Sequence, residues 1–278
     1  MRLDLHVHTD FSDGDYSPQQ IAQMAAEAKL DGVAITDHDE CRGFGALEPV
    51  AGLLLIPGIE IAAHEGDSEV HVLGLDIDWR HEAMAGYSEK ATERRKRRAR
   101  AITEKLRAAG YNVEMADVEQ SAGGGVIGRP HIARALVNKG YAESIGDAFE
   151  RFISREAPFY VPLDKISAAD TAAMILKAGG KPVLAHPGLL KPGIFDALAG
   201  QLADAGFWGI EAYHPSHTDG QCRLFESEAR RLGLYVTAGS DFHGTLGQGA
   251  ALGGEKRGGD YLQRSFEALA AGLNHALI

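Results

Sequence analysis

Short apolar segments that end in His, Asp or Glu alternate with helical patterns along most of the chain. Strand patterns cover residues 2–9, 32–38, 53–63, 69–75, 181–186, 209–213 and 234–241. Helical patterns cover residues 17–30, 168–178, 194–205, 219–232 and 260–270. Segment 53–63 is nearly all apolar, as expected of a strand that is buried on both faces. Repeated βα units over this length favour a parallel barrel, whose active site lies at the C-terminal ends of the strands.

The alternation stops between residues 89 and 163, where helical patterns prevail and 89–109 is a long, basic helical pattern. We therefore divide the chain into a barrel, formed by residues 1–88 and 164–278, and an inserted helical subdomain at 89–163 that binds substrate. The insertion holds 14 Lys and Arg against 10 Asp and Glu, a net charge of +4, whereas the whole chain carries −11. The barrel therefore carries −15, and the positive insertion is suited to face an anionic substrate.

Composition narrows the class of protein further. With 45% hydrophobic and 24% charged residues, the chain is globular rather than disordered. The N-terminal segment has no apolar signal core, and no run approaches the roughly 18 apolar residues that span a bilayer. We therefore expect a cytoplasmic protein without a membrane partner. Cys41 and Cys222 have no C-x-x-C partner, which argues against a thiolate zinc site and a disulfide framework. Any metal must be bound by nitrogen and oxygen atoms.

Nine side chains of metal-ligand type lie in or next to the predicted strands. They are His6, His8, Asp13, His38, Glu60, His71, His186, Asp241 and His243. His6 and His8 are two residues apart on a strand, so both side chains leave the same face and can converge on one ion. Burial of this many polar groups without a partner is costly, which favours bound cations over a purely structural role.

Six motifs resemble, in order, those of the polymerase and histidinol phosphatase (PHP) family. They are H-x-H-T at 6–9, S-D-G at 12–14, T-D-H at 36–38, G-I-E at 58–60, A-H-P at 185–187 and G-S-D-F-H at 239–243. The match extends over both segments that flank the insertion, and the combination of motifs is highly specific. The resemblance implies a distorted (β/α)7 barrel of the PHP type that binds up to three divalent ions.

Carried over motif by motif, the resemblance also implies which residues hold each ion. The first ion would be held by His6, His8, Glu60 and Asp241, the second by Glu60, His71 and His186, and the third by Asp13, His38 and His243. Glu60 would bridge the first two ions. Asp13 stands where some relatives carry His, so the third site would offer a harder ligand set, with a carboxylate oxygen in place of a nitrogen. Mixed His and carboxylate ligation does not select one metal; we expect manganese, with zinc or iron as alternatives.

Such a centre is suited to phosphate ester hydrolysis, because divalent ions lower the pKa of a bound water and neutralise phosphate oxygens. The leaving alkoxide also needs a proton. His217, in the loop that follows the strand pattern 209–213, is our candidate to supply the proton or to bind substrate. A solvated loop histidine without a catalytic role is the equal alternative.

The insertion contains G-R-P-H-I-A-R at 128–134, which predicts the start of a short helix. Arg129, His131 and Arg134 are candidate binders of a second phosphate on the substrate, because guanidinium groups and helix N-terminal amides favour phosphate. The alternative is that Arg129 and Arg134 form structural ion pairs with acidic barrel loops. The basic run at 94–100 is interpreted as a solvated helix face.

Within the family, a barrel interrupted by an insertion with this motif looks like small bacterial phosphoesterases that remove the 3′-phosphate of nucleoside 3′,5′-bisphosphates. Their relatives trim short RNA from the 5′ end. We therefore expect a phosphoric monoester hydrolase acting on a small nucleotide or short RNA, and not on a DNA duplex. The alternatives are another phosphomonoesterase such as a histidinol phosphatase, a metal-dependent amidohydrolase, and a non-catalytic PHP module that binds nucleic acid. The extra ligands Asp13, His38 and His243 argue against the amidohydrolase.

Overall fold

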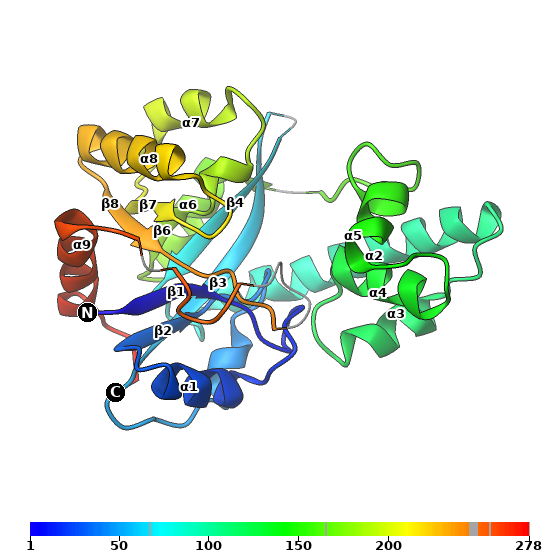
Figure 1. The fold of residues 1–278 in the computed structure, drawn as a ribbon, viewed down its shortest axis with the longest axis horizontal. Helices are drawn as coiled ribbons and strands as arrows, with labels where there is room; N and C mark the ends of the chain where they lie inside the picture. Colours follow the sequence, from blue (N-terminus) through cyan, green and yellow to red (C-terminus); the bar gives the residue numbers. More distant parts are fainter. Residues whose placement is uncertain (67, 165, 245–249, 256, 278) are drawn as a thin grey trace.

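The structure is a computed structural model that describes residues 1–66, 68–164, 166–244, 250–255 and 257–277. Seven strands follow one another around a barrel-shaped sheet (Figure 1). They are β1 (Leu3–Val7), β2 (Gly32–Ile35), β3 (Leu54–Glu65), β4 (Ser68–Leu75), β6 (Lys181–Leu184), β7 (Gly209–Tyr213) and β8 (Tyr235–Ala238). A short strand, β5 (Ile166–Ser167), pairs with β3 outside this path. The sheet is closed by backbone hydrogen bonds from His8 N to Phe242 O (3.0 Å) and from Asp241 N to His6 O (2.9 Å).

The barrel is not uniformly parallel, so the interpretation of the alternation as a parallel barrel was wrong at one strand. β4 runs antiparallel to both of its neighbours, β3 and β6. Only residues 66 and 67 separate β3 from β4, and a parallel connection needs about a dozen residues or more. The distorted seven-stranded barrel implied by the family resemblance is confirmed.

Four strands end earlier than their sequence patterns indicate, at Val7, Ile35, Leu184 and Ala238. After β1 and β2, hydrogen bonds of side chains replace those of the backbone ladder. The Asp37 carboxylate accepts hydrogen bonds from Thr9 N (2.7 Å) and Thr9 Oγ1 (2.6 Å), and from Ser12 Oγ (2.6 Å). The ligand-type residues that follow β1, β2 and β8 therefore lie in short loops that hydrogen bonds hold in place.

Helices cover the outside of the barrel (Figure 1). They are α1 (Pro18–Glu27), α6 (Ala168–Lys177), α7 (Ile194–Leu202), α8 (Asp219–Leu232) and α9 (Asp260–Ala271), with short 3₁₀ turns η1 (Arg42–Ala46) and η3 (Pro187–Leu189). α1 begins as predicted: the Ser17 side chain accepts from Gln20 N, and the Gln20 side chain accepts from Ser17 N. Among the described residues, no helix is both long and apolar enough to cross a membrane.

The insertion folds into helices that lie beside one end of the barrel (Figure 1). They are α2 (Glu82–Ala108), α3 (Met115–Ala122), α4 (Arg129–Asn138), α5 (Ile145–Ala148) and the π-helical turn η2 (Phe149–Ile153). These helices share an apolar cluster of their own, to which Ile102 and Phe152 belong. α2 begins seven residues before the expected boundary, and its first turns place Met84 and Tyr87 in the barrel core. One continuous helix therefore joins the two cores.

Candidate metal centre

Glu60 is at the centre of a polar cluster at the mouth of the barrel. Its side chain is fully buried, and it comes from the middle of the long strand β3. Oε1 lies 2.7 Å from His71 Nδ1 and 3.0 Å from His186 Nε2. Oε2 lies 2.7 Å from His38 Nδ1 and 3.3 Å from His8 Nε2. One carboxylate thus contacts histidines from four separate segments of the chain.

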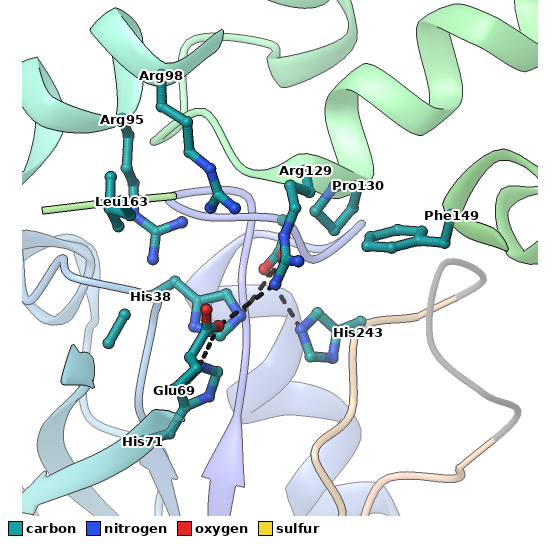
Figure 2. Close-up of a pocket in the computed structure, with 12 residues that line it drawn as sticks. His38, Glu69, His71, Arg95, Arg98, Arg129, Pro130, Phe149, Leu163 and His243 are labelled. Carbon is teal, nitrogen blue, oxygen red and sulfur yellow. Dashed lines mark hydrogen bonds and ion pairs between the residues drawn. The ribbon is translucent and has the colours of Figure 1, made fainter. Parts of the chain in front are cut away.

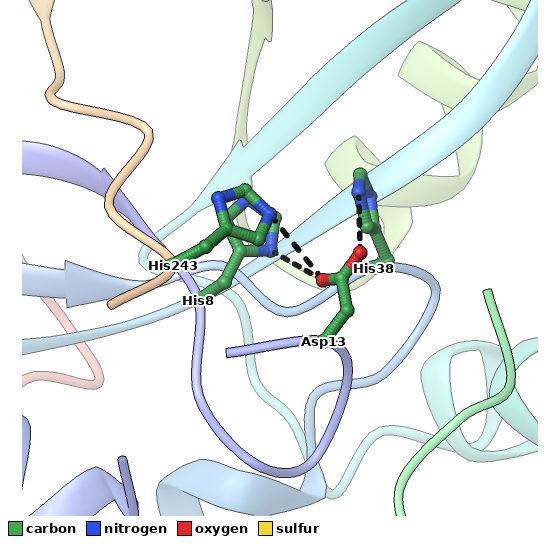
Figure 3. A group of neighbouring side chains, drawn as sticks. All are labelled: His8, Asp13, His38 and His243. Atoms are coloured by element: carbon green, nitrogen blue, oxygen red, sulfur yellow. Dashed lines mark ion pairs between the residues drawn. The ribbon is translucent and has the colours of Figure 1, made fainter. Parts of the chain in front are cut away.

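All nine candidate ligands come together, in four overlapping groups. Within each group the ligand atoms lie within 4.8 Å of one another: His8, Asp13, His38 and His243; His6, Glu60 and His186; His6, His8 and Asp241; His38, Glu60 and His71. Figure 3 shows the first group, in which Asp13 lies between His38 on one side and His8 and His243 on the other. The grouping differs from the implied sets: His8 joins the Asp13 group, His38 joins His71 at Glu60, and His6 accompanies Glu60 and His186.

Several buried atoms of the cluster have no hydrogen-bonding partner among the described residues. They are His6 Nε2, His8 Nε2, Asp13 Oδ1, His38 Nδ1, Glu60 Oε2 and His186 Nδ1. Several of these atoms lie within ion-pair distance of an oppositely charged group, but the geometry of the contacts is not that of a hydrogen bond. Each such group costs about 1–3 kcal/mol when it is left unsatisfied. Nitrogen and oxygen atoms that converge on shared points in this way fit divalent cations.

The charges of the cluster are coupled in the metal-free chain. Burial acts to lower the pKa of His71, but the Glu60 carboxylate outweighs it and raises this pKa to about 10. Burial likewise opposes the effect of Asp13, which raises the pKa of His243 to about 10. At His8, burial and the charges of its histidine neighbours lower the pKa to about 3. Protons thus stand in for part of the positive charge that a bound cation would bring.

Two buried carboxylates that the sequence analysis did not single out hold the ligands in place. Glu211 on β7 accepts a hydrogen bond from His6 Nδ1 (3.1 Å), which directs His6 Nε2 into the cluster, and another from His186 N (2.7 Å). Asp4 on β1 accepts from Ser240 N (2.9 Å), beside Asp241. Each is an acidic residue inside a short, fully buried strand, and an acidic residue within such an apolar-rich strand pattern could have identified both.

The inserted helices α2 to α5 are called the cap from here on. Helix α2 of the cap is linked to the metal centre through Asp39, the residue that follows His38. Asp39 Oδ2 accepts from Arg95 Nε (2.7 Å), and its other oxygen accepts from the Tyr87 hydroxyl. Arg95 and Arg98 are 7% and 9% exposed. The interpretation of the run 94–100 as a solvated face was therefore wrong for these two residues, because this side of α2 packs over the barrel mouth.

The three predicted substrate binders on α4 contact the protein itself: the two arginines pair with barrel carboxylates, and the histidine bonds to its own helix. Arg129 Nη2 lies 3.3 Å from Glu69 Oε1, and Arg134 Nη2 lies 3.1 Å from Asp15 Oδ1. Both arginines thus make ion pairs with acidic barrel residues, as the alternative interpretation expected, although Glu69 lies in strand β4 rather than in a loop. His131 is buried, and its Nδ1 accepts from Gly128 N (2.9 Å) at the start of α4. That bond caps the helix and leaves Nδ1 unavailable to a ligand.

The backbone holds both ring nitrogens of His217. Its Nδ1 donates to Ala212 O (3.1 Å), its Nε2 accepts from Gly188 N (3.1 Å), and the ring is buried. Both ring nitrogens are thus committed to the backbone, which argues against the predicted role of His217 as a proton donor and favours its alternative, a histidine without a catalytic role. The neighbouring His214 faces the cluster instead: its buried Nε2 lies 3.5 Å from Asp241 Oδ2 and has no hydrogen bond among the described residues.

Two cavities lie between the cap and the cluster, and Asp13, Pro130, Phe149 and His243 line both. The smaller has a volume of about 200 Å³. Figure 2 shows its three arginines on one side and its three histidines on the other. The larger, of about 830 Å³, has walls formed by apolar side chains together with hydroxyl and carboxylate groups.

The chain is similar to several known proteins. The PHP domain matches residues 4–153. The 5′-3′ exoribonuclease Rnm of Escherichia coli is 34% identical over 247 residues, 86% of this chain and 84% of the relative. A 3′,5′-nucleoside bisphosphate phosphatase of Chromobacterium violaceum is 34% identical over 252 residues, 87% of each chain. The solved structure of an amidohydrolase from Chromobacterium violaceum, with bound sulfate and no metal, has a TM-score of 0.89, is 30% identical, and covers 99% of this chain and 98% of its own.

The PHP domain match covers more than half of the chain, and the exoribonuclease and the bisphosphate phosphatase are both named for the hydrolysis of phosphate esters. Together with the nine convergent ligand-type side chains, these findings give the class of the protein: the chain belongs to the PHP domain family and is a metal-dependent phosphoesterase.

Proposed function

We propose that this phosphoesterase hydrolyses the 3′-phosphate of nucleoside 3′,5′-bisphosphates. The observation that carries the proposal is the cavity of about 830 Å³ that opens directly beside the metal cluster. A volume of this order is typical of sites for a small organic ligand, and a nucleoside placed there would have its phosphate at the cluster. The bisphosphate phosphatase at 34% identity supports the same substrate. Trimming of short RNA from the 5′ end is the second candidate activity, and the similarity to an exoribonuclease favours it.

The cluster is proposed to hold three divalent ions, with manganese first and zinc or iron as alternatives. Bound there, such ions would lower the pKa of a water and neutralise the charge of the phosphate oxygens. The residues proposed as ligands are His6, His8, Asp13, His38, Glu60, His71, His186, Asp241 and His243. Glu60, shared by two of the four groups, would be the bridging ligand.

On the cap side, α4 would present the residues that select the substrate. Arg129 lines the smaller cavity, His131 holds the first turn of the helix, and Arg134 lies further out against Asp15. The side chains of Arg129 and Arg134 are both partly exposed, at 22% and 32%. Ion pairs at such positions contribute only about 0–1 kcal/mol, so an incoming phosphate can replace either carboxylate at little cost.

Phosphate release from adenosine 3′,5′-bisphosphate with added Mn²⁺ tests this function. We expect one phosphate and one 5′-AMP per substrate, no release from 5′-AMP itself, and loss of activity with a chelator. A 5′-phosphorylated dinucleotide should give a 5′-mononucleotide if the chain also trims RNA. Release of the 5′-phosphate, or turnover of an amide with no phosphate released, would contradict the proposal.

His214 is proposed to bind the substrate or its leaving group in place of His217. His214 Nδ1 faces Ser216, whose N–H donates to it (3.2 Å) and whose Oγ lies 2.7 Å away, so Nε2 is the ring nitrogen left for the larger cavity that His214 lines. We expect His214→Ala to lower kcat about 100-fold, the lower range for a positioned proton donor.

His217→Ala is the matched comparison. We expect it to keep kcat within about fivefold, but to lower the melting temperature, because two buried backbone groups lose their partner at about 1–3 kcal/mol each. Steady-state kinetics and thermal unfolding of both variants provide the measurement. A kcat loss confined to His217→Ala would reverse the assignment.

A further inference from the structure

We propose that Arg257 is a positioning residue for the reaction: it fixes the turn that carries His214, and thereby holds the His214 ring against the metal cluster. The inference rests on the proposed function, in which His214 binds the substrate or its leaving group, and deepens it by naming the residue that aligns His214. Arg257 comes from the segment between β8 and α9. It lines neither of the two cavities beside the cluster, so it would act through His214 and not by touching the substrate.

The side chain of Arg257 makes five hydrogen bonds, as many as a guanidinium has N–H groups. Nη2 donates to His214 O (2.7 Å), and Nη1 donates to His217 O (2.7 Å). Nε and Nη2 donate to the carboxylate of Glu255 at 2.9 and 2.6 Å, and Nη1 donates to Asp219 Oδ1 (3.3 Å). One side chain thus joins the turn after β7, the first residue of α8 and its own loop.

The ion pair with Glu255 orients the guanidinium of Arg257. The Glu255 side chain is 5% exposed. Burial acts to raise its pKa, but the hydrogen bonds and charge of Arg257 outweigh burial and hold this pKa below its ordinary value. Two parallel bonds to a carboxylate fix the plane of a guanidinium, and the remaining N–H groups of Arg257 reach the two carbonyls of the turn. A lysine could bring the charge but not this fork.

The turn held in this way is the one that directs His214 at the cluster. His217 N donates to His214 O (2.9 Å), which closes a four-residue turn with Pro215 at the position that proline favours. Ser216 contacts Nδ1 of the ring and fixes its rotation. The buried Nε2 is then 3.5 Å from Asp241 Oδ2, without a hydrogen bond among the described residues. A shift of the turn by about 1 Å would misalign Nε2, and misplacement of this size can cost about 100-fold in rate.

The other end of the turn has a second anchor that does not depend on Arg257. His217 Nε2 accepts from Gly188 N (3.1 Å), two residues after the proposed ligand His186. A Cβ at Gly188 would lie 2.5 Å from the His217 ring, so the close approach of the two segments requires a glycine there. We therefore expect the chain to fold without Arg257, while the His214 end of the turn loosens.

The test compares Arg257→Met with Arg231→Met in the full, Mn²⁺-loaded chain. Arg231 also pairs with a carboxylate, that of Glu228, but on the surface of α8. One substrate is adenosine 3′,5′-bisphosphate, whose sugar alkoxide needs a proton to leave, and the other is p-nitrophenyl phosphate, whose leaving group does not. We expect Arg257→Met to lower kcat for the bisphosphate about 10- to 100-fold, with KM within about threefold. Turnover of p-nitrophenyl phosphate should fall no more than about threefold, and Arg231→Met should change neither.

A double variant shows whether Arg257 acts through His214. Arg257→Met combined with His214→Ala should lose no more activity than His214→Ala alone, because changes to residues that work as a unit are not additive. Losses that multiply, an equal loss on both substrates, or no loss on either would overturn the inference. If Arg257→Met folds poorly, Arg257→Lys replaces it and should show the same bisphosphate-specific loss at a smaller size.

Hydrogen–deuterium exchange separates this inference from the proposed function, because it needs no turnover. The amides of residues 214–217 should exchange faster in Arg257→Met than in the wild type, and Arg231→Met should leave them unchanged. If the wild type releases no phosphate from the bisphosphate, the proposed function fails, while faster exchange confined to this turn still supports Arg257 as the residue that holds it. Unchanged exchange in Arg257→Met would overturn the inference.

Discussion

Glu60→Gln is expected to lower phosphate release at least about 1000-fold, because metal ions supply several kcal/mol of charge stabilisation in such reactions. The Glu60 carboxylate contacts His8, His38, His71 and His186 at 2.7–3.3 Å. A glutamine has the same shape, but it removes the negative charge and places an N–H where a ligand oxygen is required. Both the metal content after dialysis and the rate of phosphate release should fall.

Glu65→Gln is the matched control, since Glu65 is the last residue of the same strand and belongs to none of the four ligand groups. It should keep the metal content and the turnover of the wild type. Circular dichroism of Glu60→Gln would show that the barrel is intact. If Glu60→Gln binds Mn²⁺ as the wild type does and turns over substrate at full rate, the assignment of this cluster as the metal centre is wrong.

The barrel strands could be predicted because each is a short apolar run with a clear break on both sides. The direction of β4 could not be predicted from the alternation, because that pattern does not distinguish a hairpin from a crossover whose helix is missing. The sequence patterns also placed the ends of several strands too far along the chain. β2 was expected to reach His38 but ends at Ile35, and the hydrogen bonds of Asp37 to Thr9 and Ser12, which replace the ladder, connect residues about 25 positions apart.

The ligand-type residues could be predicted because they recur at strand ends and carry the family motifs. Their supports could not, because the partners are far apart in sequence. Arg95 shares the buried face of α2 with Ala91 and Ile102, but the basic run around it holds a single apolar residue, and its partner Asp39 precedes it by 56 positions. His214 was not singled out beside His217, because spacing alone cannot show which of two nearby histidines donates to the backbone.

Glu211→Gln is the second change with a large expected effect, although Glu211 is not itself a proposed ligand. Its carboxylate orients His6 and accepts from His186 N. Loss of such a support typically costs about 10- to 100-fold in metal affinity or activity. We therefore expect Mn²⁺ to bind about 10- to 100-fold more weakly, measured by titration of the metal-free protein, with kcat partly restored at high Mn²⁺. Glu228→Gln on α8, a surface carboxylate paired with Arg231, should change neither quantity.

Glu211→Gln should also change how the free energy of unfolding of the metal-free protein depends on pH. A variant that only binds metal more weakly would not change it. Burial acts to raise the pKa of Glu211, but the charge and hydrogen bond of His6 outweigh it and lower this pKa to about 2, from an ordinary value of 4.5. A carboxylate with a lowered pKa stabilises the folded state above its unfolded pKa, and this stabilisation is lost as the pH falls through the folded pKa. In the metal-free protein, the free energy of unfolding should therefore be about 3 kcal/mol higher for the wild type than for Glu211→Gln near pH 6. The difference should shrink as the pH falls from 4.5 towards 2. A difference that is constant over this range, measured by urea unfolding, would mean that Glu211 acts through packing alone.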